Sequence, residues 1–191
     1  MTVAPLVGRY VATDQDYALK LLKQNITENS TATPIATNAN SKSTRAKRNY
    51  HATTGKKGSI SNIDVLSLDW EKDSASSLAD VLGGSAAQRN QKDPKFTGLD
   101  AIIACDCVYN EALVAPFVET CVDICRLRSA SEETQPTLCI IAQQLRSADV
   151  FEVWLKRFLQ DFRVWRMPDE LLLESLRENS GYVVHLGILR T

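Results

Sequence analysis

The sequence IIACDCVYNEALV, residues 102–114, begins as a buried β-strand and ends on polar and aromatic residues. Its apolar first part stops at Asp106, which lies between Cys105 and Cys107 and three residues before Tyr109. A continuous apolar run of this kind is typical of a parallel strand that helices cover on both faces. Either the two cysteines carry a function at this strand end, as metal ligands or redox partners, or the aspartate and the tyrosine do.

Short apolar runs and amphipathic stretches alternate along the chain, which predicts an α/β architecture. Apolar or β-branched runs predict strands at residues 9–14, 60–70, 99–105, 137–143, 162–166 and 182–190. Apolar residues at helical spacing predict helices at residues 17–26, 111–127, 148–162 and 169–178. No internal repeat is visible in the sequence.

The totals place the chain among globular proteins. It has 191 residues and a net charge of −1, which argues against a chain built mainly to coat nucleic acid. The length predicts one domain, residues 1–191. The sequence shows neither the apolar run of about 18 residues that a transmembrane helix needs nor a signal-peptide pattern. The five scattered cysteines fit a reducing compartment, so we expect a cytoplasmic protein.

Two polar segments interrupt the α/β pattern. Residues 30–58 contain six lysines and arginines but no acidic residue, and we expect them to form a disordered basic insertion. This insertion is either a plain solvated loop or a patch for nuclear import or weak ribosomal-RNA contact. A second polar loop is expected at residues 83–97.

The cysteines do not predict a metal site. A zinc site usually combines a Cys-x2-4-Cys pair with a second pair or with nearby histidines. The only histidines, His51 and His185, fall in the basic insertion and in a late strand. Cys121 and Cys125 are one helical turn apart on an apolar face and are expected to pack in the core. The two histidines also give little support to nucleophilic hydrolysis.

Polar or aromatic residues follow three of the expected strands, at Asp14, at Asp69 with Trp70, and at Asp106 with Tyr109. In an open α/β sheet, ligands bind at the carboxyl ends of the strands. A carboxylate such as Asp14 at this position can accept hydrogen bonds from ribose hydroxyls. Trp70 either covers a flat purine ring or is a half-buried residue that fixes a loop.

Taken together, the sequence resembles the class I, seven-strand, S-adenosylmethionine-dependent protein-lysine methyltransferases. The likeness is greatest to the fungal ribosomal lysine N-methyltransferase 5 family, which is kin to the human valosin-containing-protein methyltransferase. The segments that resemble this family are YVATDQDYALKLLKQNI (10–26), VLSLDW (65–70), ACDCVYNEALV (104–114), TLCIIAQQLRSADVFEVWL (137–155) and VVHLGILR (183–190). The resemblance covers nearly the whole chain apart from the two polar segments.

The resemblance implies a Rossmann-like, mostly parallel sheet with an antiparallel C-terminal strand. It places Asp14 at the cofactor ribose, Trp70 beside the adenine and Cys105 in the wall of the cofactor pocket. It places Asp106 and Tyr109 at the mouth of the lysine channel. The implied cofactor is S-adenosylmethionine, and the implied partner is a protein of the large (60S) ribosomal subunit. A monomer without a metal or a membrane contact is expected.

The chemistry of methyl transfer agrees with these roles. The attacking lysine amine must be neutral, and its pKa of about 10.4 makes deprotonation near pH 7 cost roughly 4–5 kcal/mol. Catalysis is then largely positioning. The Asp106 carboxylate and the Tyr109 phenol can orient the amine by hydrogen bonds and stabilise the charge that develops on it. No strong general base is evident, so proton loss to water is expected to precede attack.

One family motif is missing from this sequence. An acid-x-Gly-x-Gly type turn, with the first strand, is expected about 20–25 residues before Asp14. Only thirteen residues precede Asp14, and Gly8 is the one glycine among them. We therefore expect Met1 to be an internal methionine of a longer protein or the start of a shortened gene model. The chain alone is expected to fold marginally and to bind cofactor poorly.

Two other functions fit parts of the sequence. A truncated, non-catalytic protein-binding module of the same fold would explain the missing glycine motif. A nicotinamide-dependent Rossmann enzyme would use Asp14 equally well for an adenosine ribose, but it would leave the strand end at Asp106 and Tyr109 unexplained.

Overall fold

A computed structural model of the chain describes residues 3–30, 62–76, 78–79, 96–128 and 135–190. These residues belong to two compact units, Met1–Asp69 and Trp70–Thr191. Nearly all of the predicted basic insertion and most of the predicted polar loop lie outside the described residues. No helix in the described part of the chain is long and apolar enough to cross a membrane.

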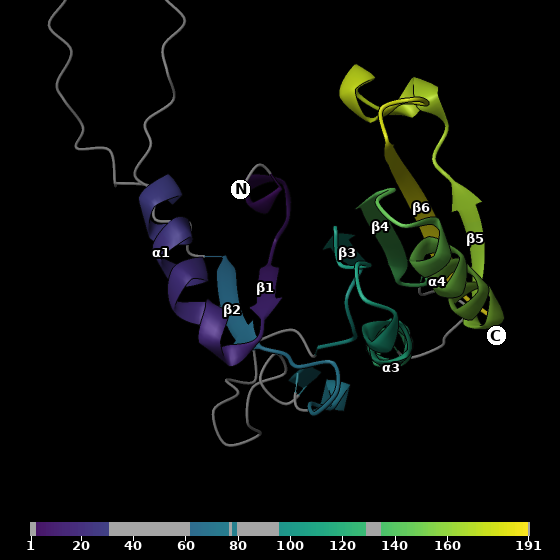
Figure 1. Cartoon of the computed structure of the whole chain (residues 1–191). Helices are drawn as coiled ribbons and strands as arrows, with labels where there is room; N and C mark the ends of the chain where they lie inside the picture. Colours follow the sequence, from purple (N-terminus) through teal and green to yellow (C-terminus); the bar gives the residue numbers. More distant parts are fainter. Residues whose placement is uncertain (1–2, 31–61, 77, 80–95, 129–134, 191) are drawn as a thin grey trace, which may run out of the picture. The chain divides into compact units, whose positions relative to one another are not determined.

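The first unit is built on two parallel strands (Figure 1). Strand β1 (Tyr10–Asp14) pairs with β2 (Ile63–Ser67) along its whole length. Parallel neighbours need a crossover connection. The chain leaves β1 through a 3-10 turn, η2 (Asp16–Ala18), and helix α1 (Leu19–Ser30). An ion pair between Arg9 Nε and Asp64 Oδ2, 2.7 Å apart, joins the segment before β1 to β2.

The second unit contains a sheet of four strands in the order β3-β4-β6-β5. These strands are β3 (Ala101–Cys105), β4 (Leu138–Gln144), β5 (Phe162–Arg166) and β6 (Tyr182–Leu189). Strands β3 and β4 are parallel, and β6 is antiparallel to both β4 and β5. The expected antiparallel C-terminal strand is therefore confirmed, within a mixed α/β fold.

Helices α3 (Val114–Arg126) and α4 (Ala148–Asp161) cover one face of this sheet, as Figure 1 shows. Cys139 and Ile141 of β4 are completely buried beneath them. Cys121 and Cys125 of α3 are also buried, and the Sγ atoms of Cys125 and Cys139 lie 3.6 Å apart. Hydrogen bonding to Cys139 and burial raise the pKa of the Cys125 thiol. The prediction that Cys121 and Cys125 pack in the core is confirmed.

A row of aromatic rings joins α4 to the sheet. Trp154 and Phe158 are four residues apart on one side of α4, and Phe162, four residues further on, is the first residue of β5. All three are completely buried, and their rings stack in succession at centroid distances of 5.2 and 4.2 Å. The row lies over Gly187 of β6, where a Cβ atom would lie 2.5 Å from Phe158 Cζ. Only glycine leaves room for the ring at this position.

One predicted helix is wrong. Residues 169–178 form two separate 3-10 turns, η4 (Asp169–Leu171) and η5 (Glu174–Leu176), rather than a helix. Leu172 and Leu173 between the turns have extended backbones, with ψ near 147°. The leucine spacing suggested a helix, but two consecutive extended residues cannot continue the i to i−4 hydrogen bonds.

A buried histidine occupies the same face of β6. His185 is 6% exposed, and its ring lies 5.4 Å from Trp154 and 5.8 Å from Phe151, measured between centroids. Its Nδ1 atom has no hydrogen-bond partner in the described part of the chain. Burial lowers the pKa of His185, and the positive charge of Arg166, its partner on β5, lowers it further. The folded unit therefore favours the neutral imidazole.

Replacing Gly187 by alanine is expected to destabilise the second unit by about 1–3 kcal/mol, because the added methyl group would overlap the Phe158 ring. Urea unfolding followed by tryptophan fluorescence measures this loss. Gly8→Ala is the matched control, since nothing lies within 4 Å of a Cβ atom there. Equal stability of the two variants would show that the aromatic row does not press on β6.

The free energy of unfolding is expected to fall as the pH drops below about 6.5, the ordinary pKa of histidine. Below this pH the unfolded chain binds a proton that buried His185 resists, so the unfolded state gains stability until the lowered folded pKa is passed. The contribution reaches at most about 1.4 kcal/mol per pH unit. Urea unfolding between pH 5 and 7 should give a shallower dependence for His185→Leu, and an unchanged slope would contradict the placement of His185.

Candidate functional site

The candidate site lies where β3 and β4 end. Because the two strands are parallel, their carboxyl ends meet at the same edge of the sheet. The Asp106 backbone N–H donates to the Ala142 carbonyl oxygen at 2.7 Å, one residue beyond the end of β3. Gln144, the last residue of β4, and Arg146, which follows the strand, therefore approach the residues that follow β3.

Asp106 has an unusual backbone conformation. Its φ is +56°, in the left-handed region that few residues other than glycine, asparagine and aspartate adopt. This conformation turns the chain sharply out of the β3 direction immediately after Cys105. Non-glycine residues held in this region cost free energy and cluster at functional sites. The strand end singled out in the sequence is thus also a point of backbone strain.

An ion pair holds the Asp106 side chain. Arg146 Nη2 donates to Asp106 Oδ2 at 2.5 Å, while Arg146 Nε donates to Gln144 Oε1 at 2.9 Å. The Asp106 side chain is 40% exposed and the Arg146 side chain 59%, so solvent screens the pair and its net stabilisation is small. The pair instead fixes the position of the Asp106 carboxylate at the carboxyl ends of the strands.

Sequence reasoning missed Arg146. The signal was present, since QLR (144–146) follows a predicted strand just as DCVY follows its neighbour. Arg146 follows a strand end as Asp106 does, so its position alone marked it as a candidate. The pairing itself joins residues forty positions apart, and no local pattern encodes it.

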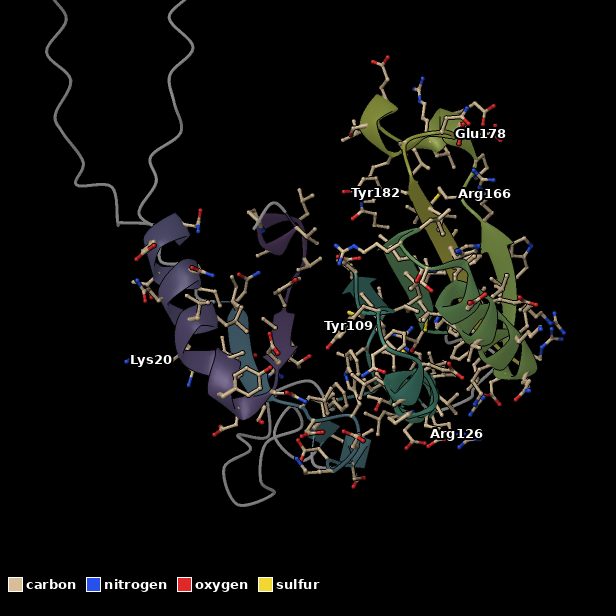
Figure 2. The ribbon with its side chains drawn as sticks, viewed as in Figure 1. Lys20, Tyr109, Arg126, Arg166, Glu178 and Tyr182 are labelled. Atoms are coloured by element: carbon tan, nitrogen blue, oxygen red, sulfur yellow. The ribbon has the colours of Figure 1, made fainter. Side chains whose placement is uncertain are left out.

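The segment after Asp106 divides between core and solvent. Cys107 and Val108 are half-buried against the core cluster, whereas Tyr109 is 61% exposed. The Asn110 side chain accepts a hydrogen bond from the Ala112 N–H at 3.1 Å and so caps the 3-10 turn η3 (Glu111–Leu113) that leads into α3. Figure 2 labels Tyr109 in this segment. The phenol is thereby accessible to a ligand at the strand edge.

Cys105 is exposed at the end of β3, and its carbonyl oxygen accepts a 3.5 Å contact from Cys107 Sγ. Trp70 is half-buried, and its ring lies 4.9 Å from that of Phe117 of α3 at an angle of 53°. The indole is therefore anchored on the core of the second unit. Both interpretations of Trp70, as a purine-covering surface or as a loop anchor, are compatible with this placement.

Asp14 ends β1 in the first unit. Its side chain is exposed, and its Oδ1 atom accepts a hydrogen bond from the Gln15 N–H at 2.8 Å. Its carbonyl oxygen accepts from the Leu68 N–H at 3.0 Å, which extends the pairing of β1 and β2. Four of the five predicted site residues thus belong to the second unit and Asp14 to the first. The functional roles of all five stay predictions.

Known proteins with similar sequences agree with the resemblance stated above. The chain is 30% identical over 186 residues to a ribosomal lysine N-methyltransferase 5 of Vanderwaltozyma polyspora, which covers 92% of this chain and 52% of the relative. It is 32% identical over 157 residues to the protein of the same name from Kluyveromyces lactis, 78% of this chain and 42% of the relative.

A relative with a different name also matches. A Schizosaccharomyces pombe protein named diaminohydroxyphosphoribosylamino-pyrimidine deaminase is 25% identical over 178 residues, but the match covers 31% of that protein. No protein-family model matches the chain. The chain spans about half the length of the ribosomal lysine N-methyltransferase 5 proteins it matches. Its relationship to these proteins is confirmed.

The stability of Asp106 variants tests whether the backbone at this position is left-handed. Asp106→Ala is expected to lower the free energy of unfolding by about 1 kcal/mol relative to Asp106→Gly, because a Cβ atom is strained at this φ. Arg146→Ala is expected to change stability by less than about 1 kcal/mol, since the ion pair is exposed. Urea unfolding measures all three variants. If Asp106→Ala is as stable as Asp106→Gly, the left-handed conformation is wrong.

Proposed function

We propose that this chain, a relative of the ribosomal lysine N-methyltransferase 5 proteins, acts as an S-adenosylmethionine-dependent protein-lysine N-methyltransferase. The proposed substrate is a protein of the large ribosomal subunit. The observation that carries the proposal is the strained, exposed strand end at Asp106, paired with Arg146, in a chain that is related to lysine methyltransferases.

The described side chains suit the adenosine part of the cofactor by chemical type. The exposed Asp14 carboxylate can accept hydrogen bonds from ribose hydroxyls, and the half-buried Trp70 indole offers an apolar ring to a purine. Cys105 contributes a small side chain at the end of β3. When bound, S-adenosylmethionine supplies an electrophilic methyl group on a sulfonium ion.

In the proposed reaction, the residues at the β3 edge position the lysine amine. Loss of its proton to water near pH 7 costs roughly 4–5 kcal/mol. The Asp106 carboxylate and the Tyr109 phenol then hold the neutral amine and stabilise the positive charge that develops on nitrogen. Arg146 acts through Asp106, because its guanidinium fixes the carboxylate that faces the substrate.

The proposal includes a seven-strand Rossmann-like sheet in a single methyltransferase domain. Strands β1 and β3 each pair with a single described strand, so each described sheet has an open parallel edge at which another strand could pair. A strand with the glycine-rich turn, which the sequence lacks, would supply the contacts to the methionine end of the cofactor. We propose that the protein is a cytoplasmic monomer and that its basic insertion makes at most a weak contact with ribosomal RNA.

Calorimetric titration with S-adenosylmethionine tests this proposal. We expect weak or no binding by the 191-residue chain and clear binding by a version extended upstream with a relative's glycine-rich strand. Asp14→Ala should abolish that binding because the ribose hydroxyls lose their acceptor. Asp106→Asn and Tyr109→Phe should keep cofactor binding but slow methylation of large-subunit ribosomal proteins by on the order of a hundredfold.

The possible outcomes separate the competing functions. Binding by the 191-residue chain itself would show that the glycine-rich strand is dispensable. Cofactor binding without methylation would favour the non-catalytic protein-binding module. If neither version binds S-adenosylmethionine, the methyltransferase proposal fails, and binding of a nicotinamide cofactor instead would support the alternative Rossmann enzyme.

A further inference from the structure

The connection between β5 and β6 borders the candidate site. We call residues 167–181 the acidic loop. The Met167 N–H donates to the Val184 carbonyl and the Leu145 N–H to the Gly181 carbonyl, both at 2.8 Å. Leu145 directly precedes Arg146, which pairs with Asp106. The loop is therefore anchored one residue away from the ion pair that marks the site.

The acidic loop has a defined structure of its own. The Asp169 carboxylate accepts a hydrogen bond from the Glu178 N–H at 3.0 Å, and Arg177 Nε donates to the Leu172 carbonyl at 3.1 Å. Asn179 and Gly181 have φ values of +67° and +78°, which turn the chain back into β6. The loop thus presents a preformed surface, which lowers the entropic cost of binding a partner.

This surface exposes large apolar side chains. Leu171 is 73% exposed and Leu173 is 76% exposed, whereas Leu172 between them is half-buried. Leu145 is 50% exposed and Tyr182 is 40% exposed. The Leu145 N–H donates to the carbonyl of Gly181, the last residue of the loop, and Tyr182 directly follows Gly181. Large apolar side chains that are exposed on an ordered loop favour a place where another molecule binds.

The same surface is strongly negative. The loop contains four acidic residues and a single basic one, Arg177, whose Nε atom is occupied by a backbone carbonyl. Glu170, Glu174 and Glu178 are exposed, and their carboxylates make no ion pair with any described residue. Figure 2 labels Glu178 and Tyr182 at this end of the second unit. The negative charge of the three glutamates favours a cationic partner and disfavours nucleic acid.

We propose that the acidic loop is the docking surface for the protein substrate. It binds a basic segment that flanks the target lysine: the glutamates attract its arginines and lysines, and Leu171 and Leu173 contact one of its apolar side chains. The docked segment leads the lysine toward Asp106 and Tyr109. This inference rests on the proposed function, because that function supplies the lysine-bearing partner.

Fluorescence polarisation of the 191-residue chain tests the docking surface without cofactor. The probe is a labelled peptide with a central lysine, arginines on both sides of it and one leucine. We expect Leu171→Ser combined with Leu173→Ser to weaken its binding by about fivefold or more. Reversing the three glutamates to lysine should abolish binding and create affinity for a matched peptide in which glutamates replace the arginines.

Leu6→Ser is the control, because Leu6 is 82% exposed but belongs to the first unit. Circular dichroism checks that each variant is folded. The inference is overturned if the basic peptide does not bind, or if the loop variants bind it as the Leu6 control does. Loss of binding in the loop variants without any methylation by the extended protein would support the docking surface and refute the proposed activity. Methylation that is unaffected by the loop variants would do the reverse.

Discussion

The second unit depends on the packing of one row of aromatic rings against Gly187 of β6, a residue that has no side chain. The Phe158 ring can approach β6 this closely only because Gly187 has no Cβ atom. Helix α4 passes directly into β5 at Phe162, so the row fixes helix and strand together. Strand β6 is held between β4 and β5, and its pairing with β4 brings Tyr182 opposite Gln144. The edge that carries the candidate site therefore depends on contacts made deep in the core.

The site itself follows from the parallel pairing of β3 and β4. Strands that run in the same direction end at the same edge, so side chains encoded forty residues apart become neighbours. The left-handed Asp106 turns the chain at this edge, and the half-buried Cys107 and Val108 hold the following segment on the core. This leaves Tyr109 exposed. Cys107 thus packs on the core and Cys105 is exposed at the strand end, while the functional roles of Asp106 and Tyr109 stay predictions.

The sequence predicted the strands well where apolar residues were continuous. Every predicted strand is present among the described residues, although β2 ends at Ser67, before the end of the predicted range 60–70, and residues 60–61 lie outside the described residues. The failures have physical reasons. The leucines of residues 169–178 fit a helix, but their exposure and the extended backbone at Leu172 and Leu173 reflect a surface loop that is shaped by its own polar contacts. The Arg146 ion pair and the conformation of Asp106 arise from tertiary pairing, which periodicity does not contain.

The distribution of charge around the site addresses a conflict in the proposed chemistry. A basic segment is attracted by carboxylates, yet a carboxylate beside the target amine stabilises the protonated form and raises its pKa. Glu170, Glu174 and Glu178 of the acidic loop make no ion pair with any described residue, whereas Asp106 is paired with Arg146. The guanidinium offsets much of the Asp106 charge while the carboxylate keeps an oxygen that can accept a hydrogen bond. In the proposed mechanism, attraction of the substrate and positioning of its neutral lysine amine are thus assigned to different carboxylates.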